Sequence, residues 1–259
     1  MGRISALLTS RGLLDMPSLF TLSEASLESM FGLGIGLLVL LGVLLVISFA
    51  RRRERLRREA FPEVLHKINA REEPEASLEF SEEDSEGRLT RLQEFRVGGM
   101  GRRRRVRNVV YGSWAGREVL CCDYRYVVGH GKHQRSYSQS ILMMKLGSSF
   151  PPFVMAPEGF FAKVAQVFGA SDIDFLTHPE FSKNYVLKGK DEGEVRAAFD
   201  FDLLEYFEQR GGLTLESHDG LLLFYRANKR CKPELLEVFF EEGFEALDAF
   251  SGKFPAALA

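Results

Sequence analysis

The residues with the greatest capacity for chemistry gather between positions 121 and 133. Cys121, Cys122 and Asp123 are followed by His130 and His133, and zinc prefers thiolate, imidazole and carboxylate ligands. A structural zinc site needs two pairs of ligands, each about two to four residues apart, and only the two histidines have such a spacing. Adjacent residues on a strand point to opposite faces, so the two cysteines cannot face one ion. The sequence therefore predicts no metal site, and no motif in it predicts a cofactor.

Side chains suited to nucleophilic or acid–base catalysis are scattered along the chain. A catalytic cysteine needs a lowered thiol pKa and a positioned base, and no such base stands beside Cys121 or Cys231. No Gly-x-Ser-x-Gly segment is present for serine hydrolysis. Asp172 and Asp174 alternate with apolar residues, so a half-buried strand explains their spacing without catalysis. These observations favour a non-enzymatic protein.

A run of arginines follows a glycine-rich segment. The segment at 98–101 resembles a phosphate-binding loop, but it lacks the Lys-Ser/Thr ending, and we expect a strand rather than a helix after it. The arginines form a concentrated positive patch that could bind anionic lipid, a nucleic-acid backbone or the chain's own acidic segment. The candidate anionic-ligand residues are Arg102, Arg103, Arg104, Arg105 and Arg107.

Residues 31–50 predict one transmembrane helix. The whole chain has 259 residues, a net charge of −2 and three cysteines, and 45% of its residues are hydrophobic; this composition excludes collagen-like, wholly disordered and disulfide-scaffold proteins. No charge interrupts residues 31–50, and a helix of that length covers roughly 30 Å, the thickness of a bilayer's hydrocarbon core. A membrane tether would hold the arginine patch near lipid, so lipid or self-contact is favoured over nucleic acid.

The residues flanking this segment predict its orientation. Only Arg3 and Arg11 precede it, whereas a cluster of arginines opposed by Glu54 follows it. Positive charge stays in the cytoplasm, so we expect the N-terminus outside and the C-terminal part inside. We expect the following arginines to contact the membrane surface: Arg51, Arg52, Arg53, Arg55, Arg57 and Arg58. Gly32 and Gly36 have the spacing of a helix-dimer motif, so a homodimer is possible; ordinary glycine content in a spanning helix is the alternative.

Composition shifts divide the chain into four parts. We expect a short extracytoplasmic tail at 1–30, the transmembrane helix at 31–50, a basic juxtamembrane helix and acidic linker at 51–90, and a cytoplasmic domain at 91–259. The helix should be limited by Pro62, which could also open a short second helix with Val64, Leu65 and Ile68 along one side. Residues 72–86 are rich in acid and predict a solvated linker.

Periodicity in the last part predicts an α+β domain, an antiparallel sheet with three packed helices. The expected strands are 91–97, 106–112, 117–128, 136–146, 172–175, 185–187, 213–217 and 221–226. The expected helices are 157–169, 191–211 and one that begins near Pro233. Asp219-Gly220 is a strong hairpin signal between the last two strands.

Several segments resemble a known group of proteins. The segments are Phe-Pro-Pro-Phe at 150–153, Asp-Ile-Asp-Phe at 172–175, His-Pro-Glu-Phe-Ser at 178–182 and Tyr-Val-Leu-Lys-Gly-Lys-Asp-Glu at 185–192. They resemble uncharacterised bacterial proteins with one membrane helix and a cytosolic α+β domain. The resemblance covers roughly the last 165 residues, the span of one ordinary domain. It implies a bacterial inner-membrane location and carries over no functional residue.

Three functions remain open from the sequence. The leading hypothesis is a membrane-anchored cytoplasmic module that binds or scaffolds an unknown protein partner at the lipid bilayer. One alternative is an anionic-lipid-sensing domain that uses the arginine patch. Another is a membrane-tethered hydrolase or transferase whose site is assembled from distant residues. Its candidate residues are His130, His133, His178, Asp172 and Asp174.

Overall fold

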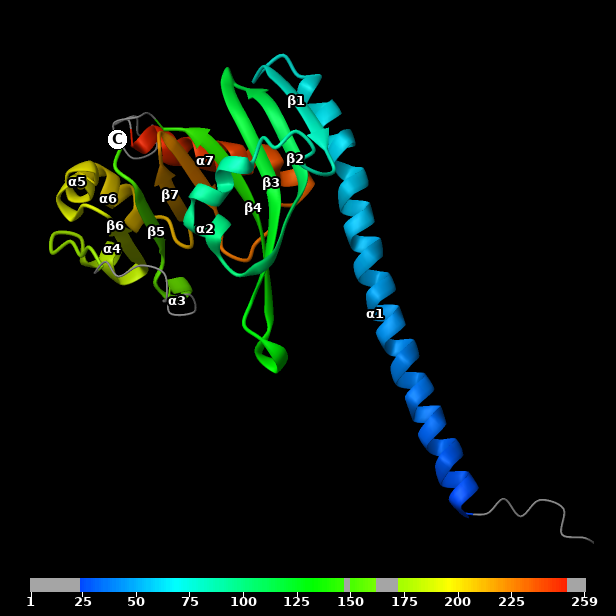
Figure 1. Ribbon diagram of the computed structural model, residues 1–259. Helices are drawn as coiled ribbons and strands as arrows, with labels where there is room; N and C mark the ends of the chain where they lie inside the picture. The colour runs from blue at the N-terminus through cyan, green and yellow to red at the C-terminus, as the bar shows by residue number, and fades with distance from the viewer. Residues whose placement is uncertain (1–23, 147–149, 162–171, 251–259) are drawn as a thin grey trace, which may run out of the picture. The chain divides into compact units, whose positions relative to one another are not determined.

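The computed structural model of the chain describes residues 24–146, 150–161 and 172–250 (Figure 1). It contains two compact units, Met1–Arg53 and Glu54–Ala259. The boundary between the two units falls inside the first helix, α1 (Glu24–Asn69). Each unit is described below by itself.

The described part of the first unit is the apolar portion of α1. In the described chain, α1 is the one helix long and apolar enough to cross a membrane, and none of its most apolar stretch is buried. Exposed leucine, isoleucine and valine side chains follow the whole of this portion. These properties fit a membrane anchor, as the sequence predicts. A Cβ atom added at Gly32 or Gly36 would meet nothing within 4 Å, and dimerisation through them stays a prediction.

The expected end of this helix at Pro62 is wrong. α1 continues to Asn69 with Pro62 inside it, and Phe61, Leu65 and Ile68 are buried in the core of the second unit. Burial of this apolar side offsets the hydrogen bond that the proline cannot make. Residues 54–69 are therefore part of the domain and not part of a linker.

The second unit is built on one eight-stranded sheet in which every neighbouring pair is antiparallel. The strands are β1 (Ala76–Ser81), β2 (Arg102–Trp114), β3 (Arg117–Val128), β4 (Arg135–Lys145), β5 (Phe153–Pro157), β6 (Tyr185–Gly189), β7 (Thr214–His218) and β8 (Leu221–Tyr225). Their order across the sheet is β1-β2-β3-β4-β8-β7-β5-β6. The expected α+β class, the long β2–β3–β4 meander and the β7–β8 hairpin are confirmed.

The acidic segment is not a solvated linker, because it contains the edge strand β1. Leu78 lies opposite Gly112 of β2 and is buried. On the outer side, the Asn69 amide donates to the Leu78 carbonyl at 2.8 Å and accepts from its N–H at 2.9 Å. The side chain thus takes the place of a further strand at this one residue of the sheet edge.

Helical segments cover both faces of the sheet. On one face lie η1 (Thr90–Glu94) and α2 (Arg96–Gly99), and on the other lies α7 (Leu236–Ala249) (Figure 1). The expected strand at 91–97 is therefore wrong. Leu92, Phe95 and Val97 are buried against the sheet, and this packing overrides the strand pattern. The remaining 3-10 turns are η2 (Gly131–His133) and η3 (Pro233–Leu235).

Short helices stand near β6. They are α3 (Glu158–Phe161), α4 (Pro179–Asn184), α5 (Glu192–Ala198) and α6 (Phe201–Glu208). The single helix expected at 191–211 is two, because Asp200 caps α6 by accepting the Leu203 N–H just as Asp191 caps α5. Most of the helix expected at 157–169 lies outside the described residues. The last expected helix is confirmed as α7.

The strand expected at 172–175 is also wrong. Asp172 accepts the N–H of Leu187 at 2.9 Å, and the Ile173 N–H donates to the Leu187 carbonyl at 2.9 Å. This segment closes the β6 edge of the sheet at one residue, as Asn69 closes the β1 edge. Asp172 therefore has a structural partner.

Candidate functional site

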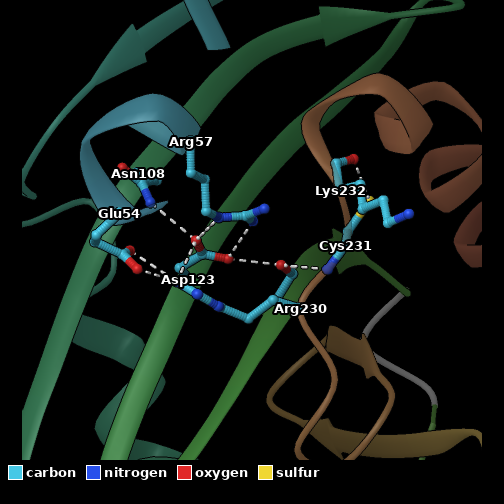
Figure 2. Close-up of polar contacts among 8 residues, drawn as sticks. Glu54, Arg57, Asn108, Asp123, Arg230, Cys231 and Lys232 are labelled. Atoms are coloured by element: carbon cyan, nitrogen blue, oxygen red, sulfur yellow. Dashed lines mark hydrogen bonds and ion pairs between the residues drawn. The ribbon is translucent and has the colours of Figure 1, made fainter. Parts of the chain in front are cut away.

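A buried carboxylate lies at the contact of helix and sheet: Asp123 on β3, whose side chain is 6% exposed. Arg57 binds both of its oxygens, with Nε 2.7 Å from Oδ2 and Nη2 2.9 Å from Oδ1 (Figure 2). Asn108 donates to Oδ2 at 2.9 Å, and the Ser140 hydroxyl donates to Oδ1 at 2.6 Å. We call these four residues the Asp123 cluster. It joins helix α1 to strands β2, β3 and β4.

A second ion pair extends the cluster to the segment between β8 and η3. Arg230 Nη1 lies 2.7 and 2.9 Å from the two Glu54 oxygens and 3.8 Å from Asp123 Oδ2. The backbone N–H of Cys231 donates to the Ser140 hydroxyl at 2.9 Å (Figure 2). The α1 helix thus contacts both the sheet and the chain that leads into α7.

A β-bulge positions Asn108. Arg107 lies opposite Asp123, but the next paired position is Val110 opposite Cys121, so Asn108 lies in the irregular stretch between them. Its φ of 50° falls in the left-handed region, which asparagine tolerates better than most residues. The bulge aims the amide at the carboxylate, as bulges commonly re-aim a side chain.

The hydrogen bonds of Asp123 decide what it can do chemically. A carboxylate has about four lone-pair sites, and the two oxygens here accept four hydrogen bonds. No acceptor capacity remains for a substrate proton or a metal ion. A buried pair of this kind specifies one arrangement of the chain more than it adds net stability. The Asp123 cluster therefore positions the helix on the sheet.

The cysteines are not poised as nucleophiles. Burial raises the pKa of the Cys231 thiol to about 12, and it raises the pKa of Cys121 and Cys122 well above the ordinary value. The thiolate is the reactive form, and these thiols stay protonated at neutral pH. Cys121 and Cys122 are buried core side chains, and Cys231 is half-buried beside the core.

The other candidate catalytic residues lie on separate elements. His130 and His133 are exposed in the loop between β3 and β4. His178 is buried before α4, with its ring 4.5 Å from that of Phe201. Asp172 is bonded to the edge of β6. In the described residues no group of three or more His, Cys, Asp or Glu could hold a metal ion.

The arginines of the juxtamembrane run have different surroundings. Arg57 is not at a membrane surface, because it is buried against Asp123 with 11% of its side chain exposed. Arg58 pairs with Glu82 at 2.6 Å, and Arg55 with Glu59 at 2.8 Å. Membrane-surface contact by the other arginines of the run stays a prediction.

The second arginine run lies in regular structure. Arg102, Arg103, Arg104, Arg105 and Arg107 all belong to β2, which begins earlier than the sequence predicts. The side chains at 103–105 are exposed, and those at 102 and 107 are half-buried. Contact of this patch with an anionic ligand stays a prediction at this point.

Two clefts lie beside charged side chains. One, of about 70 Å³, adjoins the Asp123 cluster and is too small for most organic ligands. The other, of about 330 Å³, lies between α7 and the strands β3 and β4. Its charges are matched in pairs, Arg117 with Asp248 at 2.8 Å and Lys145 with Glu118 at 2.5 Å. Neither cleft gathers the predicted catalytic residues.

Sequence reasoning missed a buried carboxyl on the opposite face of the sheet. Glu216 of β7 accepts the Tyr225 hydroxyl at 2.6 Å and the Val97 N–H at 3.2 Å to each of its oxygens. Burial raises the pKa of this carboxyl above its ordinary value, although these bonds and the Arg96 charge oppose the shift. The sequence signal was weak, because Glu216 lies in a strand that also contains Thr214, Ser217 and His218.

The raised pKa of Glu216 predicts a pH dependence of folding. An acid with a pKa raised by folding stabilises the fold fully below its unfolded pKa, near 4.5, and this contribution is lost as pH rises through the folded pKa. We expect Glu216→Gln to flatten the fall in unfolding free energy above about pH 4.5. Urea titrations followed by fluorescence of Trp114, the one tryptophan, measure this. The exposed Glu241→Gln is the control, and equal pH slopes for wild type and Glu216→Gln would refute the assignment.

We compared the chain with protein families, curated proteins and solved structures. No family model and no curated protein matches the chain. Among solved structures, the crystal structure of the mycobacterial trehalose monomycolate transport factor A, TtfA, is similar with a TM-score of 0.49 and 10% sequence identity. The match covers 77% of this chain and 94% of that chain. A likeness this slight transfers no property to the chain.

Proposed function

We propose that the chain is a single-pass membrane protein whose folded unit, Glu54–Ala259, binds or scaffolds a protein partner at the cytoplasmic side of the membrane. One observation carries the proposal. The helix that contains the apolar segment also contributes Arg57 and Phe61 to the interior of the folded unit. A domain whose core includes the end of its own apolar helix is suited to holding a protein partner at a membrane.

The flanking charges support the cytoplasmic side. Arg51, Arg52 and Arg53 directly follow the apolar segment, whereas few cations precede it. A bacterial inner membrane is the location that we propose, together with membership of the uncharacterised bacterial single-pass proteins that the sequence resembles. The free thiols of the three cysteines suit a reducing compartment.

The described chemistry supports binding over catalysis. The acceptor sites of Asp123 are filled, burial holds the thiols protonated, and the candidate histidines are divided between the β3–β4 loop and the segment before α4. Catalytic groups must converge within hydrogen-bond reach of one reacting atom.

Proximity labelling in living cells tests the proposal. A biotin ligase fused to the C-terminus of the full chain should label a defined set of neighbours. We expect replacement of residues 31–50 by an unrelated apolar span to preserve this set, and deletion of residues 1–50 to abolish it. The deletion variant and the replacement variant both keep all of Glu54–Ala259, so they differ only in residues 1–50, which include the apolar span. An unchanged set after deletion would contradict membrane-dependent binding.

A further inference from the structure

Seven cationic side chains collect around the long β3–β4 hairpin. This hairpin extends past the neighbouring strands of the folded unit (Figure 1). No acidic residue occurs in 101–110 or 124–146. We call the following residues the cationic hairpin: Arg102, Arg103, Arg104, Arg105, Arg125, Lys132 and Arg135. The whole chain is net negative at −2, so this positive charge is locally concentrated.

The cationic hairpin lacks the carboxylate partners that arginines elsewhere have. Arg196 pairs with Glu192 at 2.8 Å, and Arg226 with Glu242 at 2.7 Å. Within residues 24–146, 150–161 and 172–250, none of the seven side chains forms an ion pair with an acid. Their hydrogen bonds go to neutral acceptors, such as Arg102 to Gln134 at 3.2 Å and Arg125 to Ser136 at 3.1 Å.

Strand register places like charges together. Arg105 lies directly opposite Arg125, and like charges in opposed positions destabilise a sheet. A bulge separates Arg102 from Arg105, and Arg103 in it has a φ of 53°. A side chain other than glycine rarely adopts this backbone region. An anion bound between the strands would relieve the repulsion that this arrangement maintains.

We infer that the cationic hairpin binds the phosphate groups of anionic phospholipids. The inference rests on the proposed function and names a lipid ligand for the same folded unit. Arginine matches phosphate geometry with two parallel hydrogen bonds. The same chain carries an apolar helix fit for a bilayer, and the cytoplasmic leaflet presents anionic headgroups that attract basic segments.

A nucleic-acid backbone offers the same phosphate chemistry, but the aromatic residues of the hairpin do not favour it. Single strands bind through bases stacked on accessible aromatic rings. Tyr124 and Tyr126 are buried, and Tyr137 is stacked on Tyr126 with ring centroids 5.3 Å apart. Among the described residues of the hairpin no phenylalanine, tyrosine or tryptophan ring is exposed, and only the imidazoles of His130 and His133 are.

Vesicle binding by the full chain tests this inference. The chain is held in nanodiscs of zwitterionic phosphatidylcholine, which occupy the apolar helix and offer no anionic lipid. Sedimenting vesicles with about 30% phosphatidylglycerol are then added at about 50 mM salt. We expect binding to these vesicles, none to pure phosphatidylcholine vesicles, and release at about 500 mM salt.

Two variants with equal charge loss isolate the cationic hairpin. The first carries Arg103→Gln, Arg105→Gln, Arg125→Gln and Arg135→Gln, all at exposed positions. The control carries Arg55→Gln, Lys67→Gln, Lys145→Gln and Lys183→Gln, which are exposed cations paired with acids. We expect at least about a ten-fold loss of vesicle binding in the first and less than about a two-fold loss in the control. Trp114 fluorescence verifies that both variants are folded.

The possible outcomes separate this inference from the proposed function. Equal losses in the two variants, or no binding to anionic vesicles, would overturn the inference. Tighter binding of a single-stranded oligonucleotide at equal phosphate concentration, lost in the first variant, would replace lipid by nucleic acid. If lipid binding fails while the labelled neighbour set still depends on the span, the proposed function stands and only the lipid ligand is wrong.

Discussion

Asp123→Ala is expected to lower the free energy of unfolding of the folded unit by about 3–5 kcal/mol. The substitution leaves Arg57 buried without its carboxylate, and the Asn108 amide and Ser140 hydroxyl lose their acceptor. A buried charge without a partner costs far more than an exposed pair gains. Urea unfolding of the full chain in detergent, followed by Trp114 fluorescence, reports this unit because Trp114 is buried against Phe244.

Arg58→Ala is the matched control on the same helix. Arg58 pairs with Glu82 at 2.6 Å, but the two side chains are 36% and 60% exposed, so we expect a loss below about 1 kcal/mol. A loss below about 1 kcal/mol for Asp123→Ala as well would show that the cluster is not buried as described. Arg57→Ala combined with Asp123→Ala should cost less than the sum of the single losses, because the two side chains contact each other.

Phe61→Ala is expected to destabilise the folded unit by about 3–5 kcal/mol. Phe61 is 3% exposed, stacks on Phe80 of β1 with ring centroids 5.3 Å apart, and lies under the Arg57 guanidinium. Its removal leaves a cavity between α1 and the edge of the sheet. The same Trp114 unfolding titration measures the loss.

Leu56→Ala on the same helix separates packing from helix propensity. Leu56 is 54% exposed, so we expect a change within about 0.5 kcal/mol. If Phe61→Ala were equally mild, residues 54–69 would be a linker and not part of the domain core. A truncated chain that begins after Asn69 should then fold, whereas the structure predicts that it does not.

The sequence predicts the parts of the fold that depend on local pattern. Alternation along β3 places Cys122, Tyr124 and Tyr126 on one face, where they form a single apolar cluster. The Asp219-Gly220 turn has positive φ values at both residues, as its type requires. The apolar segment of α1 could also be predicted, because an uncharged apolar run of this length matches the thickness of a bilayer's hydrocarbon core.

The errors come from contacts between residues distant in sequence. Pro62 stands inside α1 because Phe61 and Leu65 pack on the sheet. The sequence shows an apolar side after Pro62, but it does not show that one helix continues through the proline. The acids around β1 hide the alternation of Leu78 and Phe80, which share the core face. Charge composition alone therefore made an edge strand look like a solvated linker.

The Asp123 cluster could be predicted only in part. Its residues come from four elements, and Arg57 is separated from Asp123 by 66 positions. The available signals were an acid in a strand of apolar neighbours and an asparagine, Asn108, inside a predicted strand. Each signal indicates a buried polar side chain, but neither identifies the residue that the side chain contacts. In contrast, the arginines at 102–105 are adjacent in the sequence, and the structure places them together on β2, but their binding of an anion stays a prediction.

Membrane topology is the most direct test of the central claim that an apolar helix anchors a cytoplasmic domain. Sealed right-side-out and inside-out membrane vesicles that contain the full chain are treated with protease, and a C-terminal tag is followed. The account predicts that the tag is lost only from inside-out vesicles and that alkaline washing leaves the chain in the membrane. Loss of the tag from right-side-out vesicles, or release of the intact chain by the alkaline wash, would contradict it.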